Sequence, residues 1–163
     1  KALNLKQKDS YVKLPYEEIG YNYTVSFAIN PSENNAANAV LFHSKHATVK
    51  LKQGNTSNLG FSHEGKDYDF GISIPENKWT NIAITGDNNS TTLYLNGQLA
   101  KKLSREKIPT GHKNDSIWIM KALFFPLNTI GDAQNSFIGK MKDLKVFNTI
   151  LSDAQIQAIK EEE

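Results

Sequence analysis

Short runs in which hydrophobic and polar residues alternate recur along the chain. In the run 23–29, for example, Val25, Phe27 and Ile29 alternate with smaller or polar residues. A period of two is typical of a β-strand with one buried face. About a dozen such runs follow one another at spacings of roughly 8–12 residues, as in a β-sandwich or a β-barrel. The predicted strands lie within residues 2–5, 9–15, 23–29, 39–43, 48–53, 59–63, 67–74, 75–103 (three runs), 117–120, 123–130 and 137–147.

The segment 75–103 carries the strongest of these signals. Two tight turns join its three short runs, which predicts an antiparallel meander. The second turn is Asn96–Gly97, and both residues tolerate the positive φ angles of a type I′ hairpin turn. The side chains of the meander that we expect in the core are Trp79, Ile82, Ile84, Leu93 and Leu95.

One helix is expected, at the C-terminal end. Ser152 is a good N-cap residue, and Gln155 completes a capping box three positions later. Ile156 and Ile159 supply a narrow apolar stripe. Acidic residues at 161–163 oppose the helix dipole, so we expect the helix to fray there.

Length and charge limit the possible partners. The 163 residues suffice for one domain with its own core. The net charge is only +2 and the lysines are scattered, which argues against a nucleic-acid-binding surface. The longest apolar run, 117–127, contains Lys121 and Pro126 and is too short to span a bilayer. We therefore expect neither nucleic acid nor a membrane as a partner.

Residue usage indicates the source. No cysteine is present, which excludes disulfides and thiolate chemistry. A small secreted animal domain would more often carry disulfides, so the absence of cysteine favours a bacterial source. Arg105 is the single arginine in a chain rich in lysine and asparagine, a bias typical of an AT-rich coding sequence. The chain begins at Lys1 without an initiating methionine, so we expect residues 1–163 to be one domain excised from a longer protein.

Catalytic motifs are not found. The sequence has no Gly-x-Ser-x-Gly elbow, no His-Glu-x-x-His helix and no phosphate-binding glycine loop. A glycosidase needs two carboxyl groups roughly 5–10 Å apart. The nearest candidates are Glu64, Asp67 and Asp69, but Glu64 falls in a predicted turn and the spacing does not suit a shared strand face. A polar hairpin with outward-facing acids explains them better.

The histidines and acids are the candidate metal ligands of the sequence. His43 and His46 would lie on opposite faces of a strand or flank a turn at 44–45, so they make a poor zinc pair. Asp143, between apolar neighbours, is a candidate ligand of a structural Ca²⁺ ion between the first and last strands. An ordinary exposed strand position explains Asp143 equally well.

Sugar binding is the remaining candidate function, because sugar rings stack on aromatic side chains while polar groups hold their hydroxyls. Trp118 lies between two isoleucines; either it faces solvent and they are core, or the reverse. Tyr68, between two aspartates, is similarly ambiguous. The candidate sugar-binding residues are Trp118, Tyr68, His43, His46, His63, Asn114 and Asp115.

Three parts of the chain, in this order, resemble a known family. The opening runs 3–5, 9–15 and 23–27 are similar to the start of a laminin-G-like, concanavalin A-like jelly roll. The runs 75–85 and 93–98 resemble its central signature, and 137–148 with 151–156 resemble its closing strand and short helix. The resemblance implies an all-β sandwich of two antiparallel sheets.

The resemblance also implies a function. Such domains in bacteria are often non-catalytic, lectin-like modules of secreted or cell-surface glycoside hydrolases, and the run 124–131 looks closest to those beside β-hexosaminidase-type or lacto-N-biosidase-type enzymes. Related modules that bind sialic acid use arginine pairs, so with Arg105 alone a neutral or N-acetylated sugar such as galactose or an N-acetylhexosamine is expected. Asp143 matches the family's calcium-supporting acid. The alternative is a spacer or protein-interaction domain that packs on its catalytic neighbour and binds no sugar.

Overall fold

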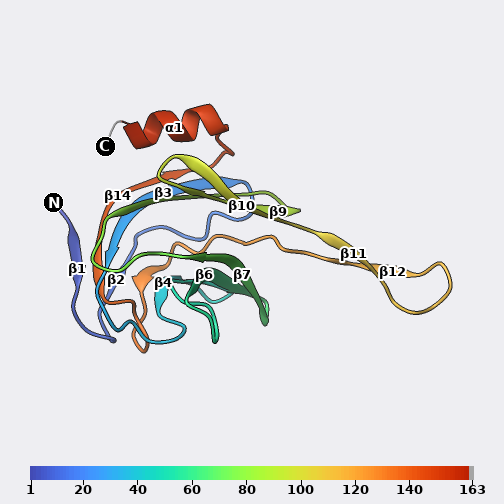
Figure 1. Ribbon diagram of the computed structural model, residues 1–163, viewed down its shortest axis with the longest axis horizontal. Helices are drawn as coiled ribbons and strands as arrows, with labels where there is room; N and C mark the ends of the chain where they lie inside the picture. The colour runs from blue at the N-terminus through green and yellow to red at the C-terminus, as the bar shows by residue number, and fades with distance from the viewer. Residues whose placement is uncertain (162–163) are drawn as a thin grey trace.

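The computed structural model describes residues 1–161 and shows two six-stranded antiparallel sheets packed face to face (Figure 1). In spatial order, the first sheet consists of β1 (Leu3–Leu5), β14 (Gly139–Phe147), β3 (Tyr23–Pro31), β8 (Thr80–Gly86), β9 (Ser90–Leu95) and β10 (Gln98–Ser104). The second sheet consists of β2 (Tyr11–Lys13), β13 (Thr129–Gly131), β4 (Val40–His43), β5 (Ala47–Lys50), β6 (Asn58–His63) and β7 (Lys66–Ser73). This is the predicted concanavalin A-like sandwich.

Aromatic rings join the two sheets. Phe27 on β3 contacts Phe42 on β4 with ring centroids 5.1 Å apart. Phe125 contacts Phe42 at 5.3 Å and Tyr23 at 5.1 Å. All four rings are fully buried, so each removes a large apolar area from water.

Phe125 belongs to a segment that crosses between the sheets at one edge of the sandwich, which we call the crossing segment (residues 120–128). The hydroxyl of Thr91 on β9 donates to the Lys121 carbonyl (3.0 Å) and accepts from the Leu123 N–H (2.8 Å). The sequence predicts a continuous strand over 123–130, and this is wrong. Only a single bridge at Phe125 and then β13 form, because Pro126 cannot donate to a ladder.

The meander prediction is confirmed as β8–β9–β10, but Trp79 is not in the core. Trp79 shares the outer face of the first sheet with Asn81 and Ala83, two and four residues further on. Its ring is half-buried and lies 4.3 Å from the Nζ atom of Lys142. Side chains alternate between the two faces of the sheet. Because Ile82 and Ile84 face the core, Trp79 faces outward.

The helix α1 (Asp153–Glu161) covers that outer face, as Figure 1 shows. The capping box is confirmed: the Ser152 N–H donates to Gln155 Oε1 (2.9 Å), and the Gln155 N–H donates to Ser152 Oγ (3.2 Å). Ile156 packs against Ala83 and Tyr94. The predicted fraying concerns 161–163, of which 162 and 163 lie outside the described residues. No described helix is long and apolar enough to cross a membrane.

A two-stranded antiparallel ribbon, β11 (Glu106–Pro109) and β12 (Ser116–Ile119), extends away from the sandwich (Figure 1). The sequence predicts only its second strand. Both faces of the ribbon meet solvent, with Ile117 and Trp118 about equally exposed at 54% and 50%. The expectation that one of the two faces is core is therefore wrong, because nothing in the described residues packs over the ribbon.

Substituting Gly86 should test the packing of β3 against β8. A Cβ atom at this position would lie 2.5 Å from the fully buried Tyr23 ring. We expect Gly86→Ala to lower the free energy of unfolding by about 1–3 kcal/mol, measured by urea denaturation. In a Tyr23→Leu background, Gly86→Ala should lower the free energy of unfolding by much less than in wild type. An equal loss in both backgrounds would show that the added methyl group does not clash with Tyr23.

A second prediction concerns Tyr94, whose hydroxyl donates to the Asp153 carboxylate at the start of α1. Burial, with help from Asp153, raises the Tyr94 pKa to about 12. Between pH 10 and 12 the unfolded chain therefore loses this proton before the folded chain does, and stability falls as pH rises. Tyr94→Phe should cost about 1 kcal/mol at pH 8.

The difference in the free energy of unfolding between wild type and Tyr94→Phe should then become smaller from pH 10 to pH 12. Urea denaturation across that range measures it. A difference that stays constant would contradict the proposed role of the Tyr94 proton.

Candidate functional site

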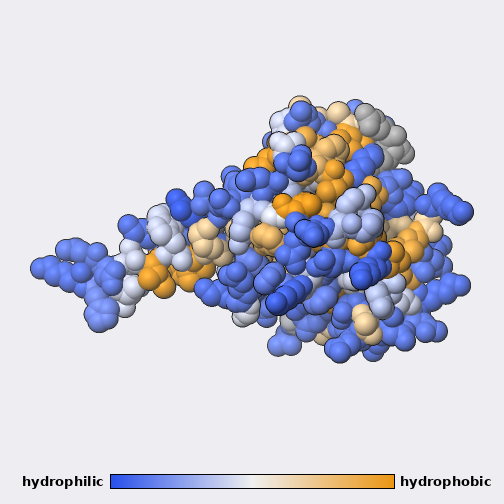
Figure 2. Space-filling model, turned by 180° about the vertical axis from the view of Figure 1, so that it is seen from behind, coloured by the Kyte–Doolittle hydropathy of each residue, from blue (hydrophilic) through white to orange (hydrophobic). Residues whose placement is uncertain are grey.

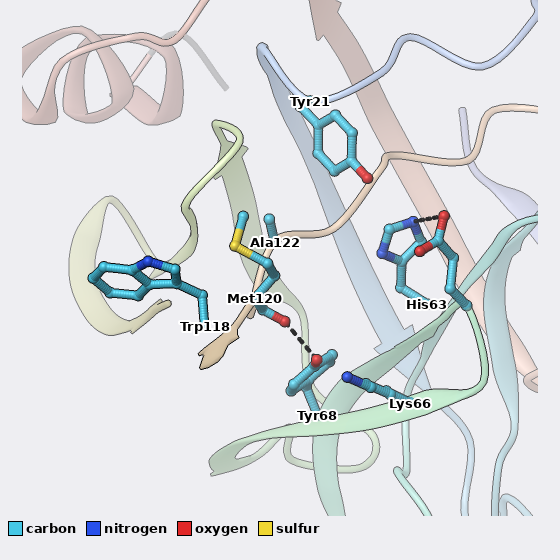
Figure 3. A pocket seen from close by; sticks show the side chains of 8 residues that line it. Tyr21, His63, Lys66, Tyr68, Trp118, Met120 and Ala122 are labelled. Carbon is cyan, nitrogen blue, oxygen red and sulfur yellow. Dashed lines mark hydrogen bonds and ion pairs between the residues drawn. The ribbon is translucent and has the colours of Figure 1, made fainter. Parts of the chain in front are cut away.

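A cleft of about 200 Å³ opens at the edge of the sandwich where the β6–β7 hairpin faces the crossing segment and the ribbon (Figure 3). We call it the ribbon cleft. It is lined by Tyr21, His63, Glu64, Lys66, Tyr68, Trp118, Met120 and Ala122. Three of the seven residues predicted to bind sugar, His63, Tyr68 and Trp118, thus lie together.

The β6–β7 turn places one wall of the cleft. Glu64 and Gly65 have positive φ angles of 50° and 78°, which close a two-residue hairpin with His63 opposite Lys66. Tyr68, two residues after Lys66, lies on the same face and packs its ring 5.1 Å from the buried Phe61 ring. The hairpin thereby presents a histidine, a lysine and a tyrosine to one side.

The aspartates of this hairpin lie on its other face. Asp67 accepts a hydrogen bond from Ser62, and Asp69 accepts from Asn58 Nδ2 (3.2 Å) and from the Gly71 N–H. Among the cleft-lining residues Glu64 is the one carboxylate. The cleft therefore does not hold the carboxylate pair that glycoside hydrolysis uses.

Two tyrosines bring hydroxyl groups to the cleft. Tyr68 donates to the Met120 carbonyl, which ties β7 to the crossing segment, as the dashed line in Figure 3 shows. Burial raises the Tyr68 pKa. Burial and the nearby Glu64 carboxylate raise the pKa of Tyr21. Both hydroxyls are therefore protonated at neutral pH; Tyr68 gives its one O–H to Met120 and can only accept from a ligand, whereas Tyr21 can donate to one.

A second, adjoining cavity is built from rings around Phe124 on the crossing segment. The His63 ring stacks on Phe124 with an interplanar angle of 6° and centroids 6.4 Å apart, while Tyr21 meets it edge-on at 5.3 Å. His46 contacts the same ring at 6.4 Å. The cavity is completed by Glu18 and Glu64, the latter 3.9 Å from His63 Nε2.

His43 is held by a local hydrogen bond between its Nδ1 atom and Thr48 Oγ1 (3.0 Å). The turn predicted at 44–45 is present, and Ser44 Oγ accepts from the N–H groups of His46 and Ala47. This turn brings His43 and His46 to one shallow hollow together with His63. Among the described residues no group of three or more His, Cys, Asp or Glu side chains could hold a metal ion.

Asn114 and Asp115 do not reach the ribbon cleft. They lie in the turn that joins β11 to β12, where Asn114 has a φ angle of 59° and the Asp115 N–H donates to the His112 carbonyl (3.1 Å). Figure 1 shows this turn at the far end of the ribbon. Their nearness to Trp118 in sequence is lost because an extended strand rises about 3.3 Å per residue.

Asp143 lies at an irregularity in β14, where the pairing with β3 shifts register between Lys142 and Lys145. Its φ angle is 56°, and aspartate tolerates this left-handed conformation better than most residues. The hollow beside it is lined by Lys142, Lys160 and Glu161 among others. Two ammonium groups make this a poor setting for Ca²⁺. Backbone geometry explains the aspartate, and calcium binding stays a prediction.

Trp118 forms the outer end of the cleft and is flanked by cations. The Arg105 guanidinium carbon lies 4.2 Å from the Trp118 ring centroid, and the Lys107 Nζ atom lies 5.8 Å from it. Lys107 is the direct cross-strand partner of Trp118. Arg105 precedes Lys107 by two positions, and its own N–H donates to the Asn89 carbonyl (2.7 Å), which fixes the start of the ribbon.

Sequence reasoning missed several residues that build the site. Arg105 was considered only as half of an arginine pair. The alternating charges of residues 105–107 could have indicated that Arg105 and Lys107 share one face of a strand. The other missed residues, Tyr21, Lys66, Lys107, Met120, Ala122 and Phe124, carry no pattern that separates them from ordinary loop or core positions.

The family of this chain follows from comparison with known proteins. The model of the concanavalin A-like lectin/glucanases superfamily, in its laminin-G form, matches residues 6–157. The chain belongs to this superfamily. The search of curated protein sequences found no match to this chain.

Solved structures share the fold of this concanavalin A-like domain. Domain 4 of AbnA, an extracellular arabinanase from Geobacillus stearothermophilus in complex with arabinotriose, has a TM-score of 0.66 at 20% identity, with 98% of this chain and 76% of that chain covered. A heptameric SAP-like pentraxin from Limulus polyphemus has a TM-score of 0.64 at 16% identity, with 98% and 80% covered. The ligand binding domain of botulinum neurotoxin serotype D, in complex with N-acetylneuraminic acid, has a TM-score of 0.60 at 20% identity, with 94% and 39% covered.

Fluorescence quenching should test the exposure and surroundings of Trp118. The chain has two tryptophans, so Trp79→Phe leaves Trp118 as the only one. We expect acrylamide to quench it readily, because half of the side chain is exposed. The ratio of iodide to caesium quenching should exceed that of free N-acetyltryptophanamide, because Arg105 and Lys107 attract anions.

Arg105→Gln should reduce the advantage of iodide. Trp118→Phe, which leaves the half-buried Trp79 beside Lys142, is the matched comparison and should show weaker acrylamide quenching. A ratio of iodide to caesium quenching in Trp79→Phe no higher than that of N-acetyltryptophanamide would contradict the cationic surroundings.

Proposed function

We propose that this concanavalin A-like domain is a non-catalytic glycan-binding module whose ribbon cleft takes a neutral or N-acetylated sugar, such as galactose or an N-acetylhexosamine. The observation that carries the proposal is the ribbon cleft itself, where Trp118 and Tyr68 offer aromatic surface beside His63, Glu64 and Lys66. Aromatic faces bind the apolar face of a sugar ring, and the polar groups can bind its hydroxyls or amide.

The arrangement supports binding without catalysis. The cleft holds one carboxylate, Glu64, which adjoins His63, while Asp67 and Asp69 are engaged in hydrogen bonds on the other face of the hairpin. Affinity should be weak, because a small cleft offers few contacts to offset the cost of ordering a sugar. A tethered module would still raise the effective concentration of its enzyme at a glycan-rich surface.

A role beside a catalytic domain is part of the proposal. The similar fold of an arabinanase domain seen with arabinotriose supports it. The parent would be a secreted or cell-surface bacterial glycoside hydrolase, of the β-hexosaminidase or lacto-N-biosidase type suggested by the run 124–131. A structural Ca²⁺ ion near Asp143 remains a separate proposal, for which repeating the sugar titration in CaCl₂ and in EDTA is the direct test.

A spacer or protein-interaction role is the second candidate, and one observation favours it. A groove beside β14 is lined mainly by hydrophobic side chains, including Tyr16, Leu144, Val146 and Phe147. Figure 2 shows hydrophobic residues gathered next to α1 and at the base of the ribbon on one face. A neighbouring domain could cover such a surface.

Titration calorimetry and a glycan array with the isolated domain test the main proposal. We expect binding of galactose-containing or N-acetylhexosamine-containing glycans with millimolar dissociation constants. Trp118→Ala should weaken binding about tenfold, because stacking on one aromatic ring is worth roughly 1–2 kcal/mol. Tyr16→Ala, which removes an equally exposed aromatic ring outside the cleft, should leave binding unchanged.

Two results would overturn the proposal. The first is the absence of any response to these sugars at millimolar concentration together with an array without hits. The second is a measured glycosidase activity that Glu64→Gln abolishes.

A further inference from the structure

We infer that the glycan recognised by this domain carries an anionic group, a carboxylate or a sulfate, which lies over the ribbon next to the ribbon cleft. This inference rests on the proposed function, because it adds a charged substituent to the sugar that the cleft would bind. The residues that carry it are Arg105 and Lys107, which flank Trp118.

Cationic and acidic side chains of the ribbon lie on opposite faces. Lys107 is paired with Trp118 across the two strands, and Arg105 and Met120 continue the same face by strand alternation. Glu106 lies on the opposite face, opposite Ile119, and is engaged by Lys121 at 3.2 Å. The face that leads into the ribbon cleft therefore presents two cations beside an exposed indole.

These cations are available to a ligand. Within residues 1–161, Arg105, Lys107 and Lys66 form no ion pair with a carboxylate. The nearest acid on the cleft wall, Glu64, lies on the β6–β7 turn beside His63, with Nε2 and Oε1 3.9 Å apart. An anionic ligand would thus meet a net positive surface made by two residues of the ribbon and by Lys66.

Arg105 is also held in a suitable position. Its backbone N–H is fixed to Asn89, and its guanidinium stacks 4.2 Å from the Trp118 ring. Stacking on an aromatic ring restrains the guanidinium while its N–H donors stay available at the edge, and this planar fork matches a carboxylate or a sulfate. Lys107 can add a second, flexible contact. A single arginine with a neighbouring lysine thereby replaces the arginine pair that sequence reasoning looked for.

Three matched disaccharides test the inference by calorimetry with the intact chain. They are N-acetyllactosamine, its derivative with a sulfate on carbon 6 of galactose, and its derivative in which that carbon is oxidised to a carboxylate. We expect at least one anionic form to bind about tenfold more tightly than the neutral form, a difference of about 1.4 kcal/mol. Raising NaCl from low to high concentration should remove most of that preference and leave neutral binding unchanged.

Substitutions assign the effect to the ribbon. In the double variant Arg105→Gln, Lys107→Gln the ratio of anionic to neutral affinity should fall to less than about twofold, whatever the change in neutral binding. Lys6→Gln, which removes an exposed charge outside the cleft, should keep the full preference. The preferred derivative identifies the group as a sulfate or a carboxylate.

The outcomes separate this inference from the proposed function. Equal binding of the neutral and both anionic forms would overturn the inference and leave the glycan-binding module standing. A preference that persists in the double variant would overturn the role of Arg105 and Lys107. Absence of binding by all three disaccharides would overturn the inference, and only together with a glycan array without hits would it overturn the proposed function as well.

Discussion

The packing of Phe125 between the two sheets is the interaction on which the rest of the structure depends. This ring contacts Phe42 from one sheet and Tyr23 from the other, at 5.3 and 5.1 Å. Its burial pins the crossing segment across the edge of the sandwich, and the two hydrogen bonds of the Thr91 hydroxyl hold the residues just before it. A fully buried aromatic ring is among the most strongly anchored groups in a protein core.

The candidate site is a consequence of that anchoring. Because the crossing segment is held at Phe125, the residues before it leave the core at a fixed place, and Met120 meets Tyr68 there. Phe124, on the neighbouring position, faces the other way and gathers Tyr21, His46 and His63 around its ring. Core packing on one side of the segment thus builds the candidate site on the other.

The sequence was a good guide wherever a residue's environment depends on its own strand. Alternation in 23–29 and the Asn96–Gly97 turn predict β3 and the meander, and the capping box at Ser152 predicts α1. The expectation of a core tryptophan at Trp79 was wrong because it went against this period: Trp79 is out of phase with the buried Ile82 and Ile84. In the ribbon, alternation did not predict which residues are buried, because both faces are exposed to solvent.

Of the candidate site, the chain alone determined the types of side chain available: aromatic rings at Trp118 and Tyr68 whose faces stayed undecided, histidines at hairpin ends and a single arginine. Only the tertiary structure decided which of them meet. Asn114 is four residues from Trp118 yet lies at the far end of the ribbon, while Tyr68, fifty residues away, shares its cleft. These distances depend on the direction of the strands and on the point at which the crossing segment leaves the core. Local patterns of hydrophobic and polar residues predict neither.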